Sequence, residues 1–116
     1  MSRGPVSKKA LETALSFAAL RGAVYFFQPG REAPADFAII TNEGVTIISV
    51  KMSRSIHGLA TDIESHYRET IARLRAVPAS VAVACELWLI SRYGRCRFFR
   101  IRNTGLLELD YPHTIP

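Results

Sequence analysis

Hydrophobic and polar positions recur along this chain with two different periods, which predict two helices and five strands. Apolar residues recur at helical spacing over residues 7–22 and about 59–76; Gly22 is suited to end the first helix, and Pro78 follows the second. Shorter runs of β-branched and aromatic residues predict strands at residues 24–28, 36–41, 45–52, 81–91 and 95–102. The predicted order is therefore α-β-β-β-α-β-β.

This order predicts an α/β sandwich with a central mixed sheet. Residues 36–41 and 45–52 are apolar at nearly every position, as expected for strands that are covered on both faces. A three-stranded meander, a crossover helix and two returning strands complete the sheet. Because no repeat or long linker interrupts the chain, we expect a single domain over residues 1–116, with its core in residues 7–102 and a short tail in residues 103–116.

Composition excludes several other classes of protein. The chain has 116 residues, of which 48% are hydrophobic and 22% charged, a balance typical of a globular domain rather than a disordered one. Two cysteines are too few for a disulfide framework or a structural zinc site. The longest apolar run, residues 81–90, is much shorter than a membrane span, and the first residues lack the apolar segment of a signal peptide. We therefore expect a cytoplasmic protein with reduced thiols and no membrane partner.

The net charge of +5 comes from one segment. Lys and Arg number 15 against 10 Asp and Glu, and five of the arginines lie in the eleven residues 92–102, which contain no acid. These arginines are Arg92, Arg95, Arg97, Arg100 and Arg102. Such a segment indicates a polyanionic partner, because guanidinium groups bind phosphates with two hydrogen bonds. The alternative is an edge strand protected from aggregation by its charges.

The turn of this basic hairpin strengthens the first interpretation. A two-residue turn at Tyr93-Gly94 would set Arg92 and Arg95 opposite each other. Like charges in directly opposed positions destabilise a sheet unless an anion lies between them. We therefore predict that the hairpin contacts nucleic-acid phosphates, with an affinity that falls steeply as salt is added.

The residues best suited to chemistry are Asp36, Ser49 and Lys51. Asp36 begins the second strand, and Ser49 and Lys51 share one face of the third, while Val50 points to the other face. A two-residue loop at Glu43-Gly44 would place Asp36 opposite Lys51, a four-residue loop opposite Ser49, and a three-residue loop opposite Val50. A buried acid and lysine are costly unless they are paired or bind a metal. A structural ion pair and an active site are both consistent with this pattern.

Pro34-Ala35-Asp36 followed by Ser49-Val50-Lys51 resembles the motif of the PD-(D/E)XK nuclease superfamily. This is the restriction-endonuclease-like fold, which includes small archaeal Holliday junction resolvases. The order of helix, short strand, motif-bearing hairpin and helix extends the resemblance over residues 7–102. It implies cleavage of phosphodiester bonds with Mg²⁺ or Mn²⁺, with DNA favoured over RNA as the substrate. It also implies a homodimer, for which the strand 81–91 with Trp88 is the candidate surface.

One departure from the family motif is Ser49, which stands where the family usually has an acid. Some restriction enzymes of the superfamily with Ser-x-Lys take the missing carboxylate from the next helix, about thirteen residues after the lysine, which is Glu64 in this chain. The resemblance then implies that Asp36, Glu64 and the Val50 carbonyl hold the metal. Lys51 would orient or deprotonate the attacking water, and Ser49 would contribute a hydrogen bond. The alternative for Glu64 is an exposed helical ion pair with the arginine four residues later.

Two further residues are accessory candidates. Glu12 resembles a glutamate that related resolvases place near the metal, although a solvated glutamate in the first turn of a helix is the more ordinary interpretation. Arg54 follows Lys51 and would add a contact near the scissile phosphate.

Two functions from different classes therefore follow from the sequence. The first is a metal-dependent nuclease, which Glu64 favours. The second is a catalytically inactive nucleic-acid-binding or assembly module with the same fold, which Ser49 favours. A small-molecule enzyme has little support, because no glycine-rich phosphate loop or Ser-His-Asp spacing is present.

Overall fold

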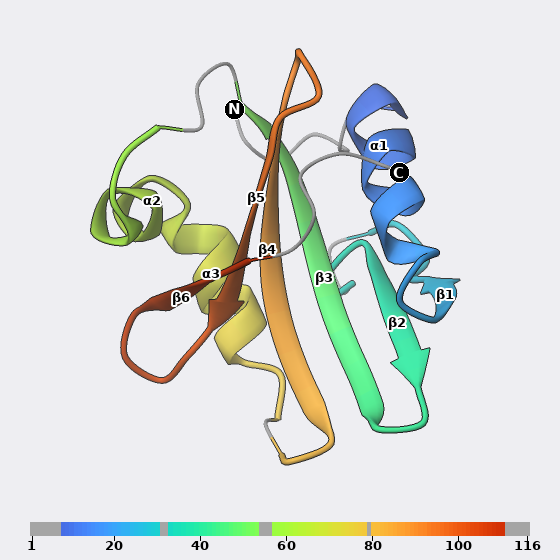
Figure 1. Ribbon diagram of the computed structural model, residues 1–116. Coiled ribbons are helices and arrows are strands. Elements are labelled where there is room, and N and C mark those ends of the chain that lie inside the picture. Colours follow the sequence, from blue (N-terminus) through green and yellow to red (C-terminus); the bar gives the residue numbers. More distant parts are fainter. Residues whose placement is uncertain (1–7, 31–32, 54–56, 79, 111–116) are drawn as a thin grey trace.

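A six-stranded sheet with helices on both faces forms the protein in a computed structural model that describes residues 8–30, 33–53, 57–78 and 80–110 (Figure 1). The helices are α1 (Lys8–Ala18), α2 (Ala60–His66) and α3 (Arg68–Arg75). The strands are β1 (Ala23–Phe26), β2 (Phe37–Thr41), β3 (Gly44–Ser53), β4 (Val83–Ser91), β5 (Cys96–Ile101) and β6 (Leu106–Leu109). The strands lie side by side in chain order from β1 to β6.

The pairing of β3 with β4 is the single parallel step in this sheet. It runs from Val45 opposite Val83 to Ser53 opposite Ser91, whereas every other neighbouring pair of strands is antiparallel. Parallel neighbours require a crossover connection, and α2 and α3 provide it. The predicted α/β class with a central mixed sheet is therefore confirmed.

Each face of the sheet has its own hydrophobic core. On the α1 face, Ala14 and Phe17 of α1 lie in one cluster with sheet residues that include Phe37, Val50 and Trp88. On the α2–α3 face, the buried residues are Ile63, Ile71 and Leu74 of the helices and Ile47, Leu87, Leu89 and Phe99 of the sheet. The side chains of a strand alternate between these two faces, which explains why the inner strands are apolar at nearly every position.

The structure differs from the predicted elements in several bounds, among them α1, which ends at Ala18 instead of at Gly22, and in two larger features. The predicted helix at 59–76 is two helices that meet at Tyr67, whose φ of −109° and ψ of 33° are not helical. The predicted tail contains a sixth strand, β6, which pairs with β5 from Phe98 opposite Leu109 to Ile101 opposite Leu106. Four residues are too few to show a strand period in the sequence, so β6 depends on its pairing with β5.

A buried carboxylate lies in the core on the α1 face. Glu86 of β4 is fully buried and accepts a hydrogen bond of 2.9 Å from the Trp88 indole nitrogen. Its two oxygens also pair with Arg21 at 3.2 Å and with Arg100 at 3.4 Å. Because the sheet and α1 exclude water from Glu86, these three donors are what makes its burial tolerable.

We expect Glu86→Gln to lower the free energy of unfolding by about 2–3 kcal/mol, because it removes the buried negative charge with which Arg21 and Arg100 pair. The loss is smaller than for a fully buried pair, since the arginine side chains are 25% and 42% exposed. Urea denaturation measures it. Glu43→Gln, in the exposed β2–β3 turn, is the matched control and should change stability by less than about 0.5 kcal/mol. Equal midpoints for the two variants would contradict the stabilising role of Glu86.

Candidate functional site

Asp36 and Lys51 lie together where β2 begins and β3 nears its end. Asp36 immediately precedes β2 and is half-buried, and its Oδ2 accepts a hydrogen bond of 2.6 Å from the backbone N–H of Val50. Burial raises the pKa of the Asp36 carboxyl above its usual value, while the hydrogen bond from Val50 and the positive charge of Lys51 oppose that rise. The structure therefore brings the predicted acid and lysine together.

The register of the β2–β3 hairpin decides this proximity. The turn is a two-residue turn at Asn42-Glu43, one position earlier than the two-residue turn considered from the sequence, and Phe37 pairs with Ile48. Asp36 lies one residue before this pair and donates its own backbone N–H to the Ile48 carbonyl at 3.0 Å. Continued by one residue, this β2–β3 pairing would set Asp36 opposite Ser49, and not opposite Lys51.

Ser49 and Lys51 lie on the α2–α3 face of the sheet. Ile47, two residues before Ser49, belongs to the core on this face, and the alternation along β3 assigns Ser49 and Lys51 to the same side. Ser49 is 6% exposed and Lys51 is half-buried. Val50 is fully buried on the opposite face, in the core beneath α1.

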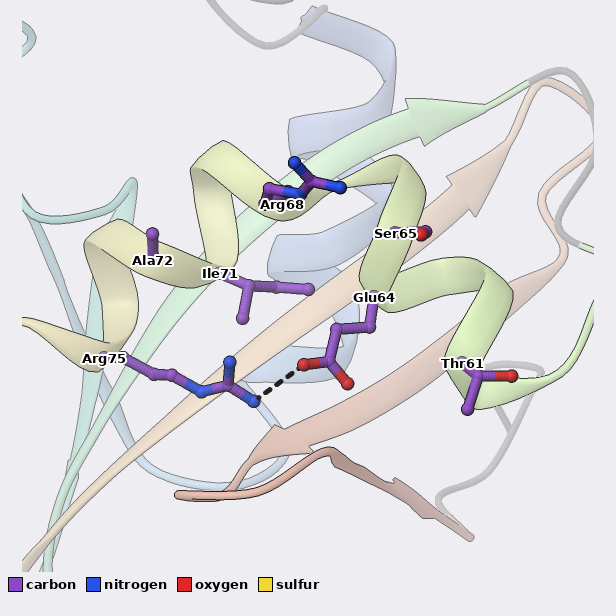
Figure 2. A pocket seen from close by; sticks show the side chains of 7 residues that line it. All are labelled: Thr61, Glu64, Ser65, Arg68, Ile71, Ala72 and Arg75. Atoms are coloured by element: carbon purple, nitrogen blue, oxygen red, sulfur yellow. Dashed lines mark hydrogen bonds and ion pairs between the residues drawn. The ribbon is translucent and has the colours of Figure 1, made fainter.

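Glu64 lies far from Asp36 across the sheet. Figure 2 shows its carboxylate directed at Arg75, with which it forms an ion pair of 3.1 Å. Arg75 also donates hydrogen bonds to the carbonyls of Arg102 and Gly105, in the turn between β5 and β6. Through Arg75, Glu64 is held beside the β5–β6 turn, whereas Asp36 precedes β2, three strands away from β5 in the order of the sheet.

The pocket beside Glu64 does not include the other predicted site residues. It has a volume of about 490 Å³ and lies along α2 and α3 (Figure 2). Its lining residues are Thr61, Glu64, Ser65, Arg68, Ile71, Ala72 and Arg75. The partner of Glu64 is thus Arg75, from the next helix, rather than the Arg68 ion pair considered from the sequence.

The two-carboxylate site for Mg²⁺ is not assembled by these residues. Asp36 and Glu64 do not converge, and Ser49 contributes no charge beside Asp36. Within residues 8–30, 33–53, 57–78 and 80–110, no group of three or more His, Cys, Asp or Glu side chains is placed to hold a metal ion. The arrangement at Asp36 is therefore one carboxylate beside one lysine.

Of the two accessory candidates, Glu12 is not part of this arrangement. Glu12 is exposed on α1, which packs against the opposite face of the sheet from Ser49 and Lys51. It fits the ordinary interpretation of a solvated helix residue. Arg54, predicted to contact the scissile phosphate, lies outside the described residues.

Three of the five arginines of residues 92–102 lie away from the hairpin tip. On the α2–α3 face, Arg97 forms an ion pair of 2.6 Å with Glu108 of β6 and donates a hydrogen bond of 2.9 Å to the Gly58 carbonyl. On the α1 face, Arg100 pairs with Glu86. Arg102 is exposed, but it follows β5 at the end opposite to Arg95. These arginines do not form one continuous basic surface.

Arg92 and Arg95 remain at the tip of the β4–β5 hairpin, and both are exposed. Ile90 pairs with Cys96, and the Ser91 N–H donates to the Arg95 carbonyl at 2.8 Å, so the turn has three residues, Arg92-Tyr93-Gly94. The predicted two-residue turn, with Arg92 opposite Arg95, is wrong, because Gly94 with a φ of +84° adds a third residue to the turn. Within the described part of the chain, neither guanidinium has a hydrogen-bond or ion-pair partner.

The tip of the β4–β5 hairpin and Lys51 lie at the same end of the sheet. Ser53 of β3 is opposite Ser91 of β4, and the arginine-bearing turn follows Ser91 directly. Figure 1 shows this turn projecting beyond the end of β3. The parallel pairing of β3 with β4 thus places Lys51 and the two arginines of the turn at the same end of the sheet.

The surface predicted for a homodimer is not available on β4. Trp88 is fully buried, and β4 is an inner strand between β3 and β5. Exposed apolar side chains occur instead on β1 and β2, at Tyr25, Phe26 and Ile40. The homodimer itself stays a prediction. No helix in the described segments is both long and apolar enough to cross a membrane.

No protein-family model matches this chain, and no curated protein matches it.

We expect the Asp36 carboxyl to titrate above the usual aspartate pKa, because its burial outweighs the Val50 hydrogen bond and the Lys51 charge. Carbon-detected NMR of the side-chain carboxyl measures this pKa. Lys51→Met should raise it further, whereas Lys51→Arg keeps the charge and should leave it nearly unchanged. A carboxyl that titrates at or below the usual value would contradict this environment.

The same pKa shift has a consequence for stability. Because the folded-state pKa is raised, the folded protein binds this proton more tightly than the unfolded chain does. Protonated Asp36 therefore contributes fully to the free energy of unfolding below the pKa that this carboxyl has in the unfolded chain. The contribution is lost as the pH rises through its pKa in the folded protein. Asp36→Asn should remove that part of the pH dependence in urea denaturation.

Proposed function

We propose that this protein binds nucleic acid, DNA in preference to RNA, through the β4–β5 turn and the neighbouring end of β3. The observation that carries the proposal is the pair Arg92 and Arg95, which are exposed on a projecting turn without polar partners in the described part of the chain. Guanidinium groups in this state are available for phosphate oxygens. Lys51 lies at the same end of the sheet, half-buried beside Asp36, so the two arginines supply the exposed positive charge.

We further propose that the fold is restriction-endonuclease-like. Three features support this assignment: the order α1-β1-β2-β3 followed by a helical crossover to β4, the acid at the start of β2, and the lysine near the end of β3. The close approach of Asp36 to Val50 is also what a Pro-x-Asp and x-Val-Lys hairpin would require. These features concern the hairpin and its neighbours and leave the edge strand β6 unexplained.

Binding without cleavage is the form of this proposal that the site geometry favours. The resemblance requires a second carboxylate beside Asp36, and Glu64 is engaged by Arg75 at the β5–β6 side of the sheet. Ser49 is nearly buried and neutral, so it does not replace that carboxylate. The inactive-module alternative therefore accounts for more of the described residues than the Mg²⁺-dependent nuclease does.

One observation favours cleavage as a second candidate function. Asp36 is a half-buried acid with a raised pKa beside a lysine, and perturbed groups of this kind are concentrated at active sites. A structural pair at a strand end would have the same appearance, so activity measurements must separate the two.

We expect Arg92→Ala/Arg95→Ala to weaken binding to a fluorescein-labelled 20-nucleotide DNA, measured by fluorescence anisotropy across a salt series. If each arginine contacts one phosphate, the slope of log affinity against log salt should decrease in magnitude by about two. Arg68→Ala/Arg73→Ala on α3 removes the same charge from an exposed helical surface and is the control. An equal loss in both double variants would show that net charge, rather than the turn, determines binding.

For the second candidate, supercoiled plasmid and four-way-junction DNA are incubated with the protein in Mg²⁺, Mn²⁺ or EDTA. We expect binding without nicking, because Asp36 lacks a second carboxylate. Metal-dependent nicking that is lost in both Asp36→Asn and Lys51→Met would contradict the inactive module and establish the nuclease. Nicking that persists in both variants would indicate a contaminating enzyme.

A further inference from the structure

Tyr93 occupies the apex of the β4–β5 turn and is 81% exposed. Its neighbours in the chain are Arg92 on one side and Gly94-Arg95 on the other, so one exposed aromatic residue is flanked by two exposed arginines. A large exposed ring is unfavourable in water, and this one contacts neither hydrophobic core. The turn therefore presents an apolar, planar surface together with positive charge.

The backbone of this turn is held in one conformation. The Ser91 hydroxyl accepts hydrogen bonds from the N–H groups of Tyr93 at 3.2 Å and Arg95 at 3.0 Å. The Gly94 N–H donates to the Ser91 carbonyl at 3.0 Å, and the φ of +84° at Gly94 is one that other residues rarely adopt. A turn that is already ordered loses less conformational entropy when it binds a ligand.

We propose that Tyr93 stacks on an unpaired nucleic-acid base while Arg92 and Arg95 contact the adjacent phosphates. The ligand class is single-stranded or branched nucleic acid, because the faces of its unpaired bases are open to an aromatic ring whereas those inside a continuous duplex are covered by their neighbours. This inference rests on the proposed nucleic-acid binding and adds the substrate structure that the turn selects. A protein partner would explain an exposed tyrosine equally well, but two arginines without an acidic neighbour in the turn favour a polyanion.

The experiment compares two fluorescein-labelled probes, a 20-nucleotide oligothymidine and a 20-base-pair blunt duplex, by anisotropy at one salt concentration. Base–aromatic stacking predicts that Tyr93→Ala lowers the ratio of single-strand to duplex affinity about tenfold, within a range of about 5- to 150-fold. Tyr93→Phe keeps the ring and should retain the wild-type ratio, because stacking does not need the hydroxyl. Tyr93 is exposed, so circular dichroism should show both variants folded.

A second variant reports stacking directly. Tyr93→Trp places an indole at the apex, and oligothymidine should quench its fluorescence, whereas the fully buried Trp88 of the wild-type protein should give no such change. A Tyr93→Trp signal that oligothymidine leaves unaltered would overturn the stacking contact.

The outcomes separate this inference from the function on which it rests. If Tyr93→Ala leaves the affinity ratio unchanged while Arg92→Ala/Arg95→Ala weakens both probes, the stacking role is wrong and nucleic-acid binding stands. If the wild-type protein binds neither probe at low salt, both proposals fail, and a protein partner becomes the explanation of the turn.

Discussion

The parallel pairing of β3 with β4 is the constraint on which the rest of the structure depends. It continues from Val45–Val83 to Ser53–Ser91, and its strands are covered by helices on both faces. Because a parallel step needs a crossover, it requires α2 and α3 on one face and leaves the other to α1. Because the two strands run in the same direction, their C-terminal ends lie at the same end of the sheet. Lys51 and the β4–β5 turn are therefore near each other. The proposed binding surface is therefore a consequence of strand direction.

Two of the five arginines in residues 92–102, Arg97 and Arg100, form ion pairs inside the fold. Arg100 and Arg21 compensate the buried carboxylate of Glu86, and Arg97 joins Glu108 to the Gly58 carbonyl. Side chains alternate along β5, so Arg97 and Arg100 lie on opposite faces and serve different layers. A run of arginines in a strand is thus distributed by geometry between stabilising roles and exposed positions. In this segment Arg92 and Arg95, at the turn, are exposed, whereas Arg97 and Arg100 of the strand are paired.

The chemistry of Asp36 depends on which carboxylates lie near it. The Val50 N–H and the Lys51 charge favour the ionised form, and burial opposes it more strongly. A second carboxylate would change this balance and create a cation site. Glu64 instead satisfies Arg75, which in turn binds two carbonyls of the β5–β6 turn. This interaction connects α2 and α3 to the β5–β6 turn and keeps the Glu64 carboxylate there, away from Asp36.

The sequence by itself determined the order of the main elements, the α/β class, the shared face of Ser49 and Lys51 and the local origin of the +5 charge, because hydrophobic period and strand alternation are local properties. It did not determine the break at Tyr67, strand β6, the three-residue turn at Tyr93 or the burial of Trp88. The sequence also did not predict that Glu64 pairs with Arg75 or that Arg97 pairs with Glu108. Each of these depends on which residues distant in the chain become neighbours, and only the tertiary structure, through strand pairing and the packing of helices on each face, decides that.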